Sequence, residues 1–161
     1  MLLISHRGNV SGSDPGLENN PDHIDRIIVG MEMNVEVDFW VFDQQEMYLG
    51  HDTPQYGIDF RWLYTRRNKL WIHCKNIEAL TYLHNCPVNN ELNYFWHQQD
   101  SFTLTSKGYI WAYPGCQIHL PSRAIAVMPE ESKTNLRPFY GICTDFPERY
   151  LVNDKINTVR S

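Results

Sequence analysis

Val35-Glu36-Val37-Asp38-Phe39-Trp40-Val41 is the stretch of this sequence that decides the fold, because apolar and polar side chains alternate along it. Successive side chains of a β-strand point to opposite faces, so the stretch predicts a strand with the valines and Phe39 on one side and Glu36 and Asp38 on the other. Residues two apart in a strand lie about 6.6 Å apart. The two carboxylates can therefore converge on one cation.

Strand and helix signals also precede this stretch. Residues 2–5 are a short apolar run that predicts a buried strand, and it leads directly into His6-Arg7-Gly8. After a polar loop, Asn20-Pro21 predicts the start of a helix, with the asparagine as N-cap and proline at the first helical position. Apolar side chains then recur at helical spacing up to Met31.

Residues 70–75 repeat the alternation and predict a further strand, with Trp71, His73 and Lys75 on one side. Asn76 predicts an N-cap for a helix to about His84, with three side chains turned inward: Ile77, Leu80 and Thr81. Helical periodicity fades after Pro87, and only short strands are expected beyond it: residues 93–97, 109–113, 124–128 and 139–143.

Strands that alternate with helices predict parallel pairing through right-handed crossovers, with polar strand ends gathered at one rim. We therefore expect an α/β fold, a compact TIM-barrel-like (β/α) barrel. A full (β/α)8 barrel takes about 250 residues, and this chain has 161. Its outer helices must then be reduced, especially in the C-terminal half. Residues 1–161 are expected to form one barrel domain.

Composition excludes several classes of protein. Lys and Arg total 14 against 19 Asp and Glu, a net charge of -5, which argues against a nucleic-acid partner. No apolar run approaches the roughly 18 residues that span a bilayer, so membrane insertion is not expected. The four cysteines form no CxxC pair. These features predict a reduced, cytoplasmic protein.

Four short motifs occur in order within residues 1–52: His6-Arg7-Gly8, Glu18-Asn19, Glu36-Val37-Asp38 and His51-Asp52. This ordered set resembles the glycerophosphodiester phosphodiesterase family, which belongs to the superfamily of TIM-barrel phosphodiesterases that includes the phosphatidylinositol phospholipases C. Thr144-Asp145 resembles a further family signature near the end of the barrel. From the residues alone, we expect Asp145 to act as the N-cap of a final helical turn.

The resemblance implies metal-assisted cleavage of a phosphodiester next to a glycerol-like alcohol. His6 and His51 would act as general base and general acid, because imidazole titrates near neutrality. Arg7 and Lys75 would bind the phosphate, although Lys75 is about as well explained by a structural ion pair.

The resemblance also implies a divalent cation held by Glu36 and Asp38, with Mg²⁺ or Ca²⁺ as the first expectation. His73 departs from the family, where an acid stands two places before the lysine that corresponds to Lys75. As a third metal ligand, this imidazole removes a negative charge and makes Mn²⁺ or Zn²⁺ an alternative.

Three more residues are secondary candidates. Glu18 either orients neighbouring groups or adds negative charge beside the metal. His97 follows a predicted strand and faces either the site or the core. Trp111 belongs to a set of rings that either fill the core or form a stacking wall for a sugar or choline-like group: Trp96, Tyr109, Trp111 and Tyr113.

The expected function is hydrolysis of a glycerophosphodiester or a related polyol or sugar phosphodiester, through a cyclic phosphate if an adjacent hydroxyl attacks first. A lyase that releases the cyclic phosphate is one alternative. A non-catalytic module that binds glycerol phosphate or sugar phosphate is another. The expected partner of the enzyme is a small-molecule phosphodiester substrate, and a homodimer is compatible with the enzyme and with the binding module.

Overall fold

The computed structural model describes residues 1–43, 46–119 and 122–151. Ten strands within these ranges form one mixed sheet: β1 (Leu2–His6), β2 (Asn34–Phe42), β3 (Glu46–Leu49), β4 (Tyr56–Ile58), β5 (Leu70–Cys74), β6 (Tyr94–Trp96), β7 (Phe102–Leu104), β8 (Ile110–Ala112), β9 (Ala124–Val127) and β10 (Gly141–Thr144). The helices are α1 (Pro21–Gly30), α2 (Phe60–Arg66) and α3 (Ile77–Asn85), with 3₁₀ turns η1 (Asn89–Glu91) and η2 (Pro129–Glu131).

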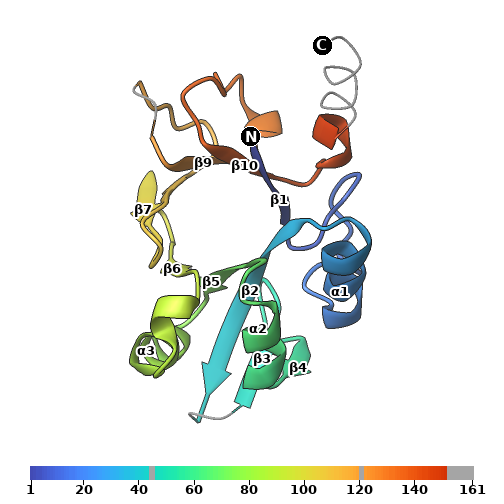
Figure 1. The fold of residues 1–161 in the computed structure, drawn as a ribbon, viewed down its shortest axis with the longest axis vertical. Helices are drawn as coiled ribbons and strands as arrows, with labels where there is room; N and C mark the ends of the chain where they lie inside the picture. The colour runs from blue at the N-terminus through green and yellow to red at the C-terminus, as the bar shows by residue number, and fades with distance from the viewer. Residues whose placement is uncertain (44–45, 120–121, 152–161) are drawn as a thin grey trace.

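Seven of these strands pair in parallel, in the order β6-β5-β2-β1-β10-β9-β8. The sheet curls so that the first and last strands pair, with β1 between β2 and β10 (Figure 1). The other three strands are antiparallel. β3 and β4 extend the second half of β2 as a meander, and β7 returns along β8.

The prediction of a TIM-barrel-like (β/α) barrel is wrong. The strands form a curled half-barrel in a strand-rich, mixed sheet: β6 pairs only with β5 and β7 only with β8 in the described part of the chain. Strand and helix do not alternate beyond α3, because the connections after β6 are loops, the β7–β8 hairpin and the turn η2. The physical reason is the loss of apolar side chains at helical spacing after Pro87.

The predicted elements of the first half are otherwise confirmed, as β1, α1, β2, β5 and α3. Asn20 and Asn76 cap α1 and α3 as predicted, through side-chain hydrogen bonds to backbone N–H groups. The predicted inward face of α3 is right for Leu80, which packs against the core, and wrong for Ile77 and Thr81 of this helix, which are exposed. Its buried residues are Ala79 and Leu83, whereas Ile77 is 58% exposed. The elements β4, α2 and β7 were not predicted.

The core has two sides because the sheet is covered on both. Outside the curl, Val35, Val37 and Phe39 of β2 pack with side chains of α1 and α3. Inside the curl, a second cluster is built around Ile4 and the rings of Trp71, Phe95 and Trp111. The polar face of β2 therefore turns toward the inside of the curl, where the candidate site residues gather.

The helices and the cysteines bear on the expectations of no membrane insertion and of reduced thiols. Across the described ranges, no helix has both the length and the apolar character needed to cross a membrane. All four cysteines carry free thiols.

The close approach of β10 to β1 predicts the outcome of a glycine substitution. A Cβ on Gly141 would lie 2.7 Å from both Cβ and O of Leu2 and 3.0 Å from Cδ1 of Ile125. We expect Gly141→Ala to lower the free energy of unfolding by about 1–3 kcal/mol, because backbone cannot move aside cheaply. Urea denaturation measures this loss.

Gly30→Ala is the matched control, since the added methyl at the end of α1 meets nothing within 4 Å. This variant should be as stable as the parent or slightly more stable. Equal stability of the two variants would show that β1 and β10 are not packed this closely.

Candidate functional site

The carboxyl ends of the parallel strands bring the predicted residues to one rim. His6 ends β1, His73 and Lys75 stand at the end of β5, and His97 follows β6. The register aligns His6 with Glu36 and Asp38 with His73. Strand pairing thus places these side chains in adjacent rows on the inside of the curl.

Asp38 is the most connected of these residues, and it is fully buried. Its Oδ2 accepts hydrogen bonds from Asn19 Nδ2 at 3.0 Å and from His51 Nδ1 at 3.2 Å. Arg7 Nε lies 3.1 Å from the same oxygen as an ion pair. Two loops of the chain, the one after β1 and the one after β3, therefore converge on one carboxylate oxygen.

The second oxygen of Asp38 faces β5. His73 Nδ1 lies 3.1 Å from Oδ1, and Lys75 Nζ lies 3.3 Å from it. Burial alone would raise the pKa of Asp38, but hydrogen bonds from His51 and His73 and the charge of Lys75 hold it well below the ordinary value. Asp38 is thus a carboxylate, and its contact with Lys75 is the structural ion pair considered for that lysine.

Glu36 is the second acid of β2 and is 2% exposed, so neither carboxylate lies on a solvated strand face. Its Oε1 lies 3.7 Å from His73 Nδ1. Burial and the negative charge of Asp38 raise the pKa of Glu36. A cation beside these two acids would relieve that repulsion.

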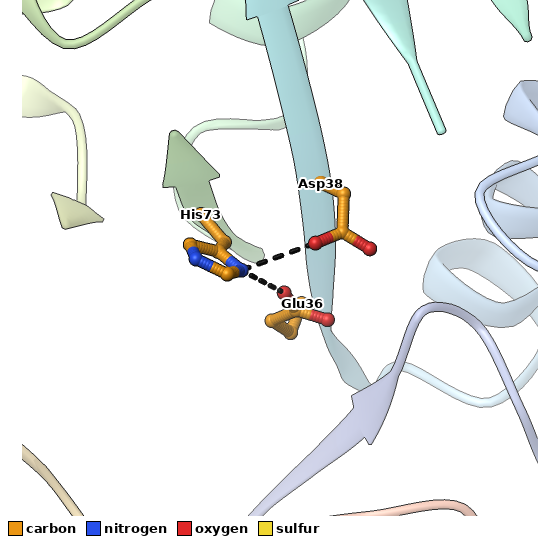
Figure 2. A group of neighbouring side chains, drawn as sticks. All are labelled: Glu36, Asp38 and His73. Carbon is orange, nitrogen blue, oxygen red and sulfur yellow. Dashed lines mark hydrogen bonds and ion pairs between the residues drawn. The ribbon is translucent and has the colours of Figure 1, made fainter. Parts of the chain in front are cut away.

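Figure 2 shows Glu36 and Asp38 of β2 and His73 of β5 pointing toward one another. One ligand atom from each lies within 4.8 Å of the others. His73 Nε2 lies 2.9 Å from the carbonyl oxygen of His97. A carbonyl only accepts, so Nε2 carries a proton.

The other nitrogen of His73, Nδ1, faces two carboxylates. Only a second proton or a bound cation makes that arrangement favourable. A carbonyl that fixes the tautomer from behind is typical of histidine metal ligands. The donor set of Glu36, Asp38 and His73 therefore fits a divalent cation.

His6 is backed by a carboxylate from the far end of the chain. Its Nδ1 donates to Asp145 Oδ1 at 2.8 Å, and Asn9 Nδ2 donates to the same oxygen at 2.8 Å. His6 Nε2 lies 4.0 Å from Glu36 Oε2. Burial alone would lower the pKa of His6, but the bond to Asp145 and the charge of Glu36 raise it above 6.5.

The role of Asp145 was missed by sequence reasoning, which expected an N-cap. Its carboxylate binds His6 and Asn9, and Thr144 Oγ1 accepts the N–H of Phe146 in the turn that follows. The available signal was the Thr144-Asp145 motif, which resembles a family signature. Asn9 and Asn19 were likewise missed as partners of site carboxylates.

His51 makes a different pair of contacts. Its Nδ1 donates to Asp38, and its Nε2 lies 3.2 Å from Arg7 Nη2. A guanidinium only donates, so His51 Nε2 is the accepting nitrogen. Arg7 therefore occupies the accepting side of the His51 ring, and Lys75 Nζ also lies 3.3 Å from its Nδ1.

Glu18 lies outside the cluster of possible metal ligands. It accepts from Arg7 Nη1 at 3.1 Å, from Asn9 Nδ2 at 3.0 Å and from Ser13 Oγ at 2.6 Å. These bonds make Glu18 a residue that orients Arg7, which was the first of the two roles considered for it.

A cavity of about 500 Å³ opens onto these residues. Its polar wall contains His6, Arg7, Glu36, His51, His73 and Lys75, and its second wall contains Trp96, His97, Gln98, Trp111 and Tyr113. Trp111 is 3% exposed and packs on Phe95, so it is mainly a core residue. Burial and the nearby His73 lower the pKa of His97.

The pairing of His6 with Asp145 predicts a titration change in the metal-free, chelator-treated protein. Asp145→Asn removes the charge that stabilises the imidazolium, so the pKa of His6 should fall and its proton should be lost at lower pH. The pH dependence of the His6 ring signals in NMR measures this.

Glu148→Gln is the matched control, because it removes the same charge from an exposed position three residues away. It should leave the titration of His6 almost unchanged. An equal fall of the His6 pKa in both variants would mean that the net charge of the protein, not the bond to Asp145, sets that pKa.

Comparisons of the chain with protein-family models, with curated proteins and with solved structures gave no match. The chemistry of these side chains is therefore the basis for assigning a function.

Proposed function

We propose that this chain is a metal-dependent phosphodiesterase that hydrolyses a glycerophosphodiester or a related polyol or sugar phosphodiester. One observation carries the proposal: His6 and His51 line the same cavity, and each is oriented by a carboxylate on its Nδ1. This arrangement supports paired acid and base catalysis, because His6 Nε2 makes no hydrogen bond in the described structure and His51 Nε2 lies beside Arg7, the proposed phosphate ligand.

Anion binding is supported by the side chains between the two histidines. A phosphodiester is negatively charged and repels nucleophiles, so its non-bridging oxygens must be neutralised. Arg7 and Lys75 line the cavity and are held in place by Asp38. Glu18 fixes the guanidinium of Arg7 from the other side.

The different surroundings of the histidines suggest their roles. His6 has a raised pKa and two nearby carboxylates, which suits a general acid that gives its proton to the leaving oxygen. His51 has an accepting Nε2 beside Arg7, which suits a general base that takes the proton of the attacking hydroxyl. Attack by an adjacent substrate hydroxyl would give a cyclic phosphate, which water opens with the two roles reversed.

A divalent cation would be held here by Glu36, Asp38 and His73. Bound, it would add neutralising charge at the phosphate oxygens. Mg²⁺ and Ca²⁺ prefer oxygen ligands, whereas imidazole suits Zn²⁺ and other transition metals. Of the four ions considered, we therefore propose Mn²⁺ or Zn²⁺ ahead of Mg²⁺ or Ca²⁺.

Thermal unfolding with each ion tests this metal preference. At a concentration 100 times its Kd, a bound ion stabilises the protein by about 2.7 kcal/mol. We expect lower concentrations of Mn²⁺ or Zn²⁺ than of Mg²⁺ or Ca²⁺ to produce this shift. His73→Asp should reverse the order, because it replaces a nitrogen ligand by oxygen.

His119→Asp controls for metal binding elsewhere, since His119 is exposed and lies outside the cavity. It should keep the preference of the parent protein. An unchanged order in His73→Asp would remove His73 from the metal site.

Phosphorus NMR with a panel of glycerophosphodiesters tests the activity itself, with each metal and with a chelator. Conversion to a monoester that the chelator abolishes is expected. His6→Gln and His51→Gln should each lower turnover by about 10²- to 10⁴-fold, and His119→Gln should not. Accumulated cyclic phosphate would identify a lyase.

Full activity of the His6→Gln, His51→Gln double variant would contradict the proposed roles. Tight binding of glycerol phosphate with no conversion under any metal would identify a binding module, the reading that the departure at His73 favours.

A further inference from the structure

His97 stands out on the second wall of the cavity because its ring has no hydrogen bond. Its side chain is only 8% exposed, and neither Nδ1 nor Nε2 has a hydrogen-bond partner in the described structure. The nearest carboxylate, Asp100 Oδ2, lies 3.9 Å from Nδ1, beyond hydrogen-bond distance. Leaving a buried polar group unpaired costs about 1–3 kcal/mol. A ligand in the cavity would remove this cost.

The position of His97 places it near the part of a bound substrate that does not react. His97 follows β6, whereas Arg7 follows β1 and Glu36 lies within β2. His73 lies between, with its ring centroid 6.2 Å from that of His97. If the phosphate of a phosphodiester binds at the polar wall, one of its two alcohol groups therefore extends to His97.

The chemistry of this wall indicates which alcohol fits. A neutral imidazole offers one N–H donor and one accepting nitrogen, and a hydroxyl group can satisfy both. The ring of Tyr113 lies 5.3 Å from that of His97, and both residues line the cavity. An apolar ring face beside a donor and an acceptor suits the alternating C–H and O–H groups of a polyol or sugar.

We infer that His97 and Tyr113 form a subsite for a polyhydroxylated alcohol group of the substrate, with His97 as the specificity-determining residue. The inference rests on the proposed phosphodiesterase function and deepens it. A quaternary ammonium headgroup would leave both nitrogens of His97 unpaired. Its natural partner on this wall would instead be the exposed Glu131.

Turnover of two substrates tests the subsite. In His97→Leu, the ratio of kcat/KM for glycerophosphoinositol to that for glycerophosphocholine should fall about 10- to 100-fold, the effect of losing one or two hydrogen bonds to hydroxyls. His97→Asn keeps a donor and an acceptor and should recover part of the ratio. His119→Leu should keep the full ratio, because His119 is exposed and outside the cavity.

Stability separates this role from a structural one. His97→Leu removes a buried polar group that lacks a partner, so the variant should unfold at the same temperature as the parent or higher. A lower unfolding temperature with an unchanged substrate ratio would make His97 a core residue and overturn the inference. An unchanged ratio in a stable variant would also overturn it.

A binding measurement tests the subsite without depending on catalysis. myo-Inositol 1-phosphate should shift the ring NMR signals of His97, and phosphocholine should shift them much less. This result without any turnover would refute the proposed activity and keep the subsite. Turnover of both substrates with no shift at His97 would keep the activity and refute the subsite.

Discussion

The site depends on one buried charge, the carboxylate of Asp38. A buried anion is tolerated only when it is paired and hydrogen-bonded, because its transfer from water costs many kcal/mol. Asp38 meets this requirement with groups from three parts of the chain: Asn19 and Arg7 after β1, His51 after β3, and His73 and Lys75 at the end of β5. The positions of His51, Arg7 and Lys75 thus follow from the need to satisfy Asp38.

Glu36 explains why this network also favours a ligand. It shares the polar face of β2 with Asp38, but its own hydrogen bond in the described structure comes from the backbone N–H of Arg7 at 3.2 Å. The nearest side-chain nitrogens, His6 Nε2 and His73 Nδ1, lie at 4.0 and 3.7 Å. The protein neutralises one of its two acids and leaves the other beside an open cavity, which is the electrostatic condition for holding a cation.

The sequence predicted the parts of this site that local pattern controls. Alternation placed Glu36 and Asp38 on one face of β2, and N-cap residues located α1 and α3. It could not show that Asp145 reaches His6, because the parallel pairing of β1 with β10 joins residues about 139 positions apart. The barrel expectation failed because it extended the helix signals of the first half to residues after Pro87. The face of α3 was misjudged because Ala79, which packs deepest together with Leu83, is small and was overlooked.

The two walls of the cavity differ in how well the sequence predicts them, because only one of them is built by segments with a regular pattern. The polar wall comes from strand ends in the first half, where short motifs carry the chemistry and spacing reveals it. The second wall comes from β6, β8 and the loops beyond them, where no period organises the sequence. Its rings look like core residues in the sequence, and Trp111 largely is one. Only the three-dimensional arrangement distinguishes His97, whose buried ring has no hydrogen bond in the described structure, from the rings that pack in the core. The proposed type of reaction could therefore be argued from sequence motifs, whereas the proposed substrate preference could be argued only from the three-dimensional structure.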